Sequence, residues 1–327
     1  MILSQTPLRL SLLGGNTDFR DYFLNFGGLV LSTTIDKYIY CIVKKRFDDK
    51  IIVNYTIKET VDDVNDIKHE LVRESLKMLG ITKGIEISFL ADIPSEGTGL
   101  GSSSAVTIGL LNALHNYQGQ SVTNQQLAEE AVNIELDVLK KPIGIQDQHA
   151  IALGGLRCIE MTQLGEVFGY KVDMNESVKE DFNNSLMLFY TGVSRKTDGV
   201  LKEFDVMTNR KLLDQNKVLA KVGTEELLRG NLKKFGGLLD IYWNFKKQMN
   251  SKTTTTEIDK MYEVAKKAGA IGGKVIGAGG GGFLLVMFPA NKRAKIRKAL
   301  KDYKELPFRF TDCGSRIIHN ICKTYLI

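Results

Sequence analysis

The sequence has few cysteines, no long apolar run and no strong excess of one charge. Its four cysteines lie far apart, without a CxxC pair or a neighbouring histidine: Cys41, Cys158, Cys313 and Cys322. This spacing excludes a disulfide framework and a zinc site and indicates reduced thiols. No stretch approaches the roughly 20 apolar residues that a membrane span needs. Because the N-terminus also lacks the basic start and apolar run of a signal peptide, we expect a cytoplasmic protein that binds no membrane.

Charge and length narrow the class of protein further. The 327 residues include 44 basic and 38 acidic side chains, spread over the whole chain. A nucleic-acid footprint would gather the basic residues on one arm or face, so we expect no nucleic-acid partner and favour anionic small ligands. Hydrophobic residues make up 43% of the chain, which suffices for ordinary cores. The length predicts two domains or one large one and leaves open whether the chain forms a homo-oligomer.

Two common nucleotide-binding motifs are also missing. A Walker A loop ends in GK[ST], but the pair Gly273 and Lys274 is followed by valine. The glycines at 277, 279 and 282 fit the spacing GxGxxG, yet the strand-like run FLLVMF follows them. A dinucleotide-binding fold requires a helix at that point. The sequence therefore excludes a P-loop NTPase and a Rossmann domain.

Hydrophobic periodicity predicts a first half of mixed strands and helices. Strands are expected where apolar residues alternate or β-branched and aromatic residues dominate, at 8–12, 29–45, 51–55 and 85–89. One helix should end at Gly80. A second should begin at Thr123, which forms a capping-box pattern with Gln126.

A polar stretch without periodicity at 173–185 divides the chain. After it we expect a strand at 186–192, helices from about 196 to 250, a TTTT loop at 253–256 and a helix ending at Gly269. A further strand, helix and strand complete the chain. The sequence thus predicts an N-terminal domain of residues 1–180 and a C-terminal domain of residues 181–327.

The most informative stretch is PSEGTGLGSSSA at 94–105, which precedes a continuous apolar run. Its glycines let the backbone approach a ligand closely, and its serines can cap a helix whose N-terminal N–H groups point into the loop. Such a construction binds phosphate, although the pattern alone also fits a glycine-rich turn before a buried helix. We define the phosphate loop as the expected phosphate-binding residues Gly97, Thr98, Gly99, Leu100, Gly101, Ser102, Ser103 and Ser104.

Three motifs in order resemble the GHMP kinases, a family named after galactokinase, homoserine kinase, mevalonate kinase and phosphomevalonate kinase. The first motif is PLRLSLLGGNTDF (7–19), the second contains the phosphate loop, and the third is KVIGAGGGGFLLV (274–286). A fourth stretch, PIGIQDQHAIALGG (142–155), is similar to the segment that carries the family's catalytic aspartate. The resemblance covers nearly the whole chain. It implies an α+β, two-domain GHMP kinase fold, with a ribosomal-S5-like N-terminal domain and a C-terminal α/β sandwich, and a kinase that uses ATP and Mg²⁺.

The resemblance implies roles for individual residues. Asp147 would take a proton from the acceptor hydroxyl and Arg9 would orient it, with catalysis by phosphate positioning alone as the alternative. Ser103 matches a hydroxyl near magnesium. Glu135 lies twelve residues before Asp147, the spacing of the magnesium-binding glutamate in the galactokinase branch, and an unpaired carboxylate beside an apolar stripe is costly without a cation. A surface salt bridge is the alternative for Glu135, and Glu130 is the rival ligand.

The first motif also bears on the acceptor. GGNTDF departs from the GEHTDY of galactokinase and is similar to the GGGTD of D-glycero-D-manno-heptose 7-phosphate kinases and, more distantly, to fucokinase. YTGVSRKT (190–197) is also similar to a segment of the heptose enzymes. The resemblance implies substrate contacts at Gly15, Asn16, Asp18, Arg195, Lys196, Gly279 and Gly280. Arg195 and Lys196 suit a sugar phosphate by charge but also fit a solvated loop, and Asn16 replaces the usual glycine.

We therefore expect a kinase that phosphorylates the anomeric hydroxyl of a heptose 7-phosphate. A 1-kinase for an unphosphorylated sugar such as fucose is the alternative within the family. A sensor that binds nucleotide and sugar without turnover is the alternative outside it, since fold does not fix function. The presence of Asp147, Glu135, Ser103 and Arg9 favours the enzyme.

Overall fold

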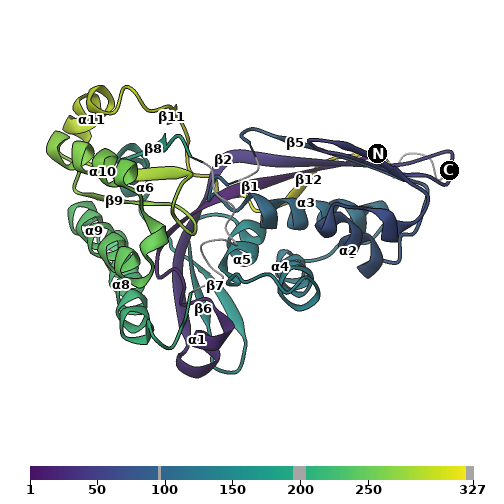
Figure 1. Cartoon of the computed structure of the whole chain (residues 1–327), viewed down its shortest axis with the longest axis horizontal. Helices are drawn as coiled ribbons and strands as arrows, with labels where there is room; N and C mark the ends of the chain where they lie inside the picture. The colour runs from purple at the N-terminus through teal and green to yellow at the C-terminus, as the bar shows by residue number, and fades with distance from the viewer. Residues whose placement is uncertain (95–96, 194–203, 322–327) are drawn as a thin grey trace.

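The computed structural model describes residues 1–94, 97–193 and 204–321, and in these ranges it contains two β-sheets with helices packed on them (Figure 1). The larger sheet has the strand order β12 (Arg316–Asn320), β1 (Ile2–Leu13), β2 (Gly28–Lys45), β5 (Ile85–Ala91), β3 (Ile51–Asn54) and β4 (Lys58–Val61). The hairpin of β6 (Arg157–Met161) and β7 (Val167–Lys171) attaches to the start of β2. Among the strand pairs in the described ranges, the β3–β5 pair alone is parallel.

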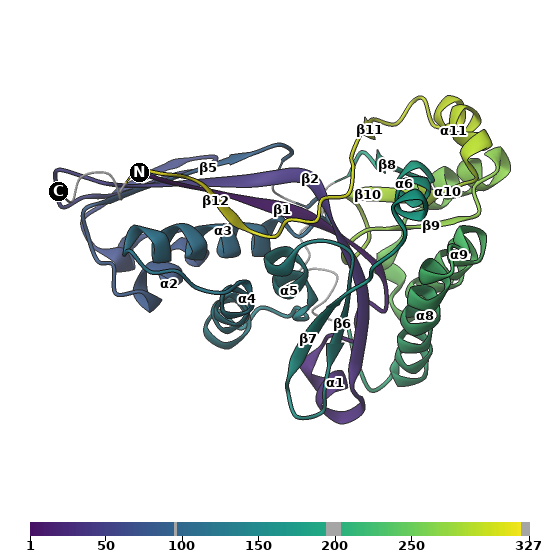
Figure 2. The same ribbon diagram turned by 180° about the vertical axis from the view of Figure 1, so that it is seen from behind.

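Helices cover one face of this larger sheet, as Figures 1 and 2 show from opposite sides. They are α2 (Glu70–Met78), α3 (Ser102–Tyr117), α4 (Asn124–Val132) and α5 (Gln146–Leu153). A six-residue π-helix, Asn133–Val138, continues α4, and α1 (Arg20–Phe26) follows β1. The α3 helix lies close to the sheet at Gly109, where a Cβ atom would come within 2.7 Å of the Thr6 hydroxyl oxygen. Close packing of α3 fixes the position of the phosphate loop at its N-terminus.

The smaller sheet is antiparallel, with the order β11 (Glu305–Leu306), β8 (Leu186–Tyr190), β10 (Phe283–Met287) and β9 (Gly272–Val275). Its helices are α6 (Glu176–Asn184), α8 (Arg210–Leu228), α9 (Leu232–Met249), α10 (Thr256–Ala268) and α11 (Arg293–Ala299). Short 3₁₀ turns lie at Val64–Asp66, Ser251–Thr253 and Ala290–Lys292. None of the helices in the described ranges combines the length and apolarity that crossing a bilayer requires.

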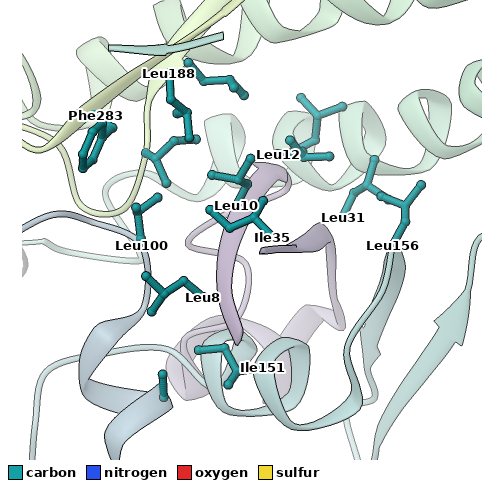
Figure 3. Packing of buried hydrophobic residues seen from close by; sticks show 14 of the residues in the cluster. Leu8, Leu10, Leu12, Leu31, Ile35, Leu100, Ile151, Leu156, Leu188 and Phe283 are labelled. Carbon is teal, nitrogen blue, oxygen red and sulfur yellow. The ribbon is translucent and has the colours of Figure 1, made fainter. Parts of the chain in front are cut away.

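One hydrophobic core joins the two sheets (Figure 3). Leu8, Leu10 and Leu12 of β1 are fully buried and belong to the same cluster as Leu188 of β8 and Phe283 of β10. Burying side chains of this kind stabilises the fold by roughly 1.5–3 kcal/mol each. The contact between the two sheets is therefore part of the core and holds the residues at the junction in place.

The last described strand, β12, belongs to the larger sheet, although it follows the smaller sheet in the sequence. β12 pairs with β1, with Ile2 opposite Asn320, so the end of the predicted C-terminal domain completes the first sheet. Thr6 and Ser315 support this pairing through a hydroxyl–hydroxyl hydrogen bond of 2.9 Å. The expected α+β composition is confirmed, whereas the division between residues 180 and 181 stays a prediction.

Candidate active site

A cleft of about 920 Å³ lies where the phosphate loop, the first motif, α5 and the third motif meet. In the phosphate loop, Gly97, Gly99 and Gly101 have φ angles of +66°, +75° and +81°, which L residues with side chains rarely adopt. Gly101 also precedes the first turn of α3. The first N–H groups of a helix have no partner within it, and here the residues that carry them, Ser102, Ser103 and Ser104, line the cleft. The loop therefore has the geometry of an anion-binding site.

The side chains of the phosphate loop divide between the core and the cleft. Leu100 is fully buried in the core and contributes only backbone to the loop, where its carbonyl accepts a hydrogen bond from the Arg9 backbone N–H at 3.0 Å. The hydroxyls of Thr98 and Ser102 hydrogen-bond to each other at 3.3 Å. Ser103 is exposed towards the cleft, and Ser104 is buried below it.

The third motif packs directly on the phosphate loop. Gly277 has φ +76°, and a Cβ atom there would lie 2.6 Å from the Cα atom of Gly99. Gly277 and Ala278 belong to the cleft wall. Gly279 and Gly280, which were expected to contact substrate, pack on Thr253, whose carbonyl accepts from the Gly280 N–H at 2.6 Å. A close backbone contact explains glycine at 279, and a φ angle of +73° explains glycine at 280, whereas the expected substrate contacts of both residues stay a prediction.

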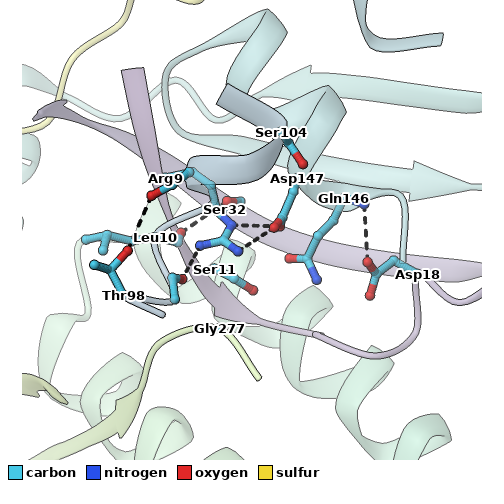
Figure 4. A network of polar contacts seen from close by, with 12 residues as sticks. Arg9, Leu10, Ser11, Asp18, Ser32, Thr98, Ser104, Gln146, Asp147 and Gly277 are labelled. Atoms are coloured by element: carbon cyan, nitrogen blue, oxygen red, sulfur yellow. Dashed lines mark hydrogen bonds and ion pairs between the residues drawn. The ribbon is translucent and has the colours of Figure 1, made fainter. Parts of the chain in front are cut away.

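Arg9 and Asp147 form a two-pronged ion pair at the centre of the cleft (Figure 4). Arg9 Nε donates to Asp147 Oδ1 at 2.7 Å and Arg9 Nη2 donates to Oδ2 at 2.5 Å. The third prong, Nη1, donates to the Gly99 carbonyl at 2.5 Å. The arginine is almost fully buried, whereas 25% of the Asp147 side chain is exposed. Arg9 thus ties the carboxylate to the phosphate loop while leaving it within reach of a ligand.

Asp18 lies in the wall of the same cleft and is 2% exposed. Its Oδ2 accepts from the Gln146 backbone N–H at 3.2 Å, and its Oδ1 is buried without a partner. Burial, and then the charge of Asp147, raises the pKa of Asp18 to about 6. Gly144 makes room for this carboxylate, since a Cβ atom there would lie 1.9 Å from Oδ2.

The turn before Asp18 explains two features of the first motif. Asn16 has φ +71°, a left-handed conformation that glycine adopts freely and asparagine tolerates. This accounts for asparagine where the resembling kinases have glycine. Gly15 has no room for a side chain, because a Cβ atom would lie 2.5 Å from the Tyr242 hydroxyl. Both residues line the cleft, as expected for substrate contacts.

Glu135 is fully buried in the π-helix and lines the cleft below the phosphate loop. Ser104 Oγ donates to its Oε2 at 3.3 Å, and its Oε1 has no partner. Burial raises the pKa of Glu135 to about 7, against the opposing effect of the Lys141 charge. Ser104 is therefore the serine in contact with Glu135, whereas Ser103, the serine expected near magnesium, is exposed and lines the cleft.

This arrangement fits Mg²⁺. Magnesium commonly takes one or two carboxylates together with substrate phosphates and water. The unpaired Glu135 Oε1 beside a phosphate-binding loop matches that donor set. In the described part of the chain, no cluster of three or more His, Cys, Asp or Glu side chains could hold a metal without such help.

Glu130, the rival magnesium ligand, lies outside the cleft wall, and so does His149, the histidine two residues after Asp147. Glu130 Oε2 lies 2.7 Å from His115 Nε2, and Glu130 Oε1 accepts from Gln126 Nε2 at 2.8 Å. His149 Nδ1 donates to the Ile145 carbonyl at 2.9 Å, and burial lowers the pKa of its ring. Arg195 and Lys196 lie outside the described residues.

The sequence predicted no role for two buried lysines near the cleft. Lys274 Nζ donates to the Ser11 carbonyl at 2.7 Å and lies 4.3 Å from the centre of the Tyr242 ring. Lys246 Nζ donates to the Gly277 carbonyl, and burial, with the charge of Arg9, lowers its pKa to about 7. The one available signal was the position of Lys246 in the spacing 239, 242, 246, 249 of an apolar helix stripe.

The opposite end of the cleft is aromatic. His69 packs edge-on against Tyr55 with ring centres 4.8 Å apart, and its ring stacks on Phe89 at 6.0 Å. No sequence motif marked this end, because its residues come from three separate elements. Aromatic rings of this kind suit a nucleotide base.

Comparisons with known proteins agree with this geometry. The family model of the GHMP kinase N-terminal domain matches residues 65–155, and that of the GHMP kinase C-terminal domain matches residues 224–305. The chain belongs to the GHMP kinase family. Members of this family are phosphotransferases that act on alcohol groups and use ATP as the phosphate donor. The predicted two-domain GHMP kinase fold is thereby confirmed.

Individual GHMP kinases extend the comparison. The chain is 28% identical over 323 residues to the D-glycero-alpha-D-manno-heptose 7-phosphate kinase of Campylobacter jejuni, covering 92% of this chain and 93% of that one. It is 26% identical to the L-fucokinase/L-fucose-1-P guanylyltransferase of Bacteroides fragilis. This match covers 92% of this chain and 36% of the relative. A solved D-glycero-D-manno-heptose 1-phosphate kinase from Bacteroides thetaiotaomicron superposes with a TM-score of 0.82 at 24% identity, over 98% of this chain and 99% of that one. The chain is thus a sugar kinase of the GHMP family by likeness to these relatives.

Proposed function

We propose that this GHMP kinase transfers the γ-phosphoryl group of ATP to the anomeric hydroxyl of D-glycero-D-manno-heptose 7-phosphate. The ion pair of Arg9 and Asp147 beside the phosphate loop carries the proposal, because it presents a carboxylate where an acceptor hydroxyl would meet a bound triphosphate. The match to the heptose 7-phosphate kinase of Campylobacter jejuni supports the choice of acceptor. In this proposal residues 1–180 form the ATP-binding domain and residues 181–327 the second domain.

Nucleotide binding uses both ends of the cleft. The N–H groups of the phosphate loop hold the phosphates, and the aromatic wall of Tyr55, His69 and Phe89 holds the base. Glu135 and a serine hydroxyl at the start of α3 would hold Mg²⁺, which would supply positive charge to offset the charge of the phosphates. Of the three serines that line the cleft at the start of α3, Ser103 is the exposed one and is proposed to contact the ion, and Ser104 keeps Glu135 in position.

Phosphoryl transfer then depends on Asp147. Its carboxylate accepts the proton of the anomeric hydroxyl as that oxygen forms a bond to the γ-phosphorus and the bond from this phosphorus to the bridging oxygen of ADP breaks. Arg9 keeps both carboxylate oxygens in place and offsets charge that develops in the transition state. Arg195 and Lys196 are proposed to meet the phosphate of the acceptor.

A steady-state assay of ADP formation over a panel of sugars tests the proposal. Heptose 7-phosphate should give the highest kcat/KM, and ³¹P NMR of the product should show a second phosphate on the anomeric carbon. The match to the fucokinase of Bacteroides fragilis favours fucose as the second acceptor to test. Turnover of fucose but not of the heptose phosphate would show that the proposed acceptor is wrong and that fucose takes its place. Binding of nucleotide and sugar without turnover would make the protein a sensor.

A further inference from the structure

Two buried oxygen atoms in the cleft wall have no hydrogen-bond partner and lie on neighbouring groups. One is Oδ1 of Asp18, and the other is the side-chain carbonyl oxygen Oε1 of Gln146, the residue that precedes Asp147. The backbone N–H of Gln146 donates to the other oxygen of Asp18, at 3.2 Å, which ties the two residues together. In Figure 4 the Gln146 side chain lies between the carboxylates of Asp147 and Asp18.

Such buried acceptors lower the stability of the fold unless a ligand donates hydrogen bonds to them. A buried acceptor without a donor costs roughly 1–3 kcal/mol, and both atoms here are acceptors. Hydroxyl groups can donate to them, whereas a phosphate cannot and would be repelled by the charge of Asp147. This part of the cleft therefore suits the hydroxyl-bearing ring of a sugar, next to the hydroxyl that reacts.

We infer that Gln146 Oε1 and Asp18 Oδ1 accept hydrogen bonds from two neighbouring ring hydroxyls of the acceptor, and that Gln146 is a specificity-determining residue. The inference rests on the proposed function and adds an orientation to it. The ring hydroxyls beside the reacting carbon face Gln146 and Asp18, so the phosphate of a sugar phosphate points away from the carboxylates of Asp18 and Asp147. A sugar without a donor at the matching position leaves the Gln146 oxygen unpaired and binds weakly.

The variant Gln146→Met tests this, because methionine has nearly the same length and no acceptor of comparable strength. A site that exists for a ligand predicts a large effect on binding and a small one on stability. Gln146→Met removes an unpaired buried acceptor together with the side-chain hydrogen bond between Gln146 and Asp18, so the ligand-free melting temperature should change little. Calorimetric affinity for heptose 7-phosphate should fall by about 10-fold, the effect of one lost hydrogen bond. Gln125→Met, the same change on α4 outside the cleft, should leave this affinity unaltered.

The 2-deoxy and 3-deoxy derivatives of the same sugar locate the contact. Wild-type protein should bind one of them about 10-fold more weakly than the parent sugar, and Gln146→Met should bind that derivative no more weakly than wild type does. Equal losses for all three sugars, with a lower melting temperature, would mean that Gln146 is structural and would overturn the inference. Unchanged affinity for all three would overturn it as well.

The same titrations separate this inference from the proposed function. If wild type binds L-fucose but not the heptose phosphate, the acceptor is wrong, and 2-deoxy- and 3-deoxy-L-fucose decide the role of Gln146 in the same way. If wild type binds none of these sugars with or without an ATP analogue, both the proposed function and the inference fail. Sugar binding without the loss specific to one hydroxyl refutes the inference alone.

Discussion

Gly99 and Gly277 touch through their backbones, and a Cβ atom on Gly277 would lie 2.6 Å from the Cα atom of Gly99. In the other direction, a Cβ atom on Gly99 would lie 2.3 Å from the Ile276 carbonyl oxygen. This contact locks the phosphate loop against the third motif. The two motifs, some 180 residues apart in the sequence, therefore act as one binding surface.

Gly277→Ala should weaken ATP binding strongly, because the loop must move to make room for the methyl group. Gly119→Ala is the matched control: Gly119 has φ +79° but no atom within 4 Å of the added Cβ. The control should lose only about 1 kcal/mol of stability, the usual cost of a left-handed alanine, and keep its ATP affinity. Calorimetric ATP titrations and urea unfolding measure both effects. Equal ATP affinity in the two variants would contradict the role of this contact.

Glu135→Gln should stabilise the ligand-free protein at pH 8. The pKa of Glu135 rises from 4.5 to about 7 on folding, so between these values the folded state keeps a proton that the unfolded state releases. Wild type therefore loses stability as pH rises through this window. The amide has no such loss, and its advantage at pH 8 should approach about 3 kcal/mol and shrink towards zero at pH 4.5. Urea unfolding at both values measures it.

Glu135→Gln should also change how the rate of the enzyme depends on the Mg²⁺ concentration. Glu135→Gln removes the carboxylate proposed to hold the ion, so it should raise the Mg²⁺ concentration needed for half-maximal rate more than it changes sugar affinity. Glu130→Gln, which alters a carboxylate bonded to His115 outside the cleft wall, should not. The ligand assignment is wrong if Glu130→Gln has this effect and Glu135→Gln does not.

Asp147→Asn should lower kcat by about 10²–10⁴, the usual effect of a lost general base, with a much smaller change in sugar KM. ATP binding should be nearly intact, because the phosphate loop uses its own N–H groups. Asp137→Asn is the matched control, since Asp137 likewise accepts two hydrogen bonds from one arginine, Arg20, but lies outside the cleft wall. More than half of the wild-type kcat in Asp147→Asn would favour catalysis by phosphate positioning alone.

Lys246→Met should flatten the pH dependence of stability above pH 7. Burial lowers the pKa of Lys246 from 10.5 to about 7, so between these values the unfolded state binds a proton that the folded state lacks. Stability of wild type therefore rises with pH in this window, by up to about 1.4 kcal/mol per pH unit for one proton. The variant should lose that slope, as measured by urea unfolding from pH 7 to 10. Lys247→Met, with a partly exposed side chain, should retain it.

Local chemistry explains what the sequence predicted well. Left-handed glycines, helix caps and apolar periodicity depend on neighbouring residues, so the phosphate loop, the end of α10 at Gly269 and the cap at Thr123 were all anticipated. Even there the capping box is half formed. Thr123 caps α4 as expected, but the side chain of Gln126 donates to Glu130 instead of returning to the start of the helix.

Contacts between segments that lie far apart in the sequence could not be predicted from it. The strand pattern at 29–45 gave no sign that β2 would pair with β6 at one end and β5 at the other. The β6–β7 hairpin was missed because most of its residues are only partly buried or exposed and show no clear alternation. The π-helix that turns Glu135 to Ser104 likewise has no signature in a single sequence.

The pairing of β12 with β1 sets an order of assembly. Because β12 follows every other described strand in the chain, one edge of the first sheet stays open until residues 316–320 have been synthesised. A fragment of residues 1–180 would expose that edge of β1, and unpaired edge strands promote aggregation. Expression of this fragment should therefore yield aggregates, and adding residues 314–321 through a linker should restore a monodisperse protein. The proposed ATP-binding domain would thus depend for its solubility on β12, a strand from the second half of the chain.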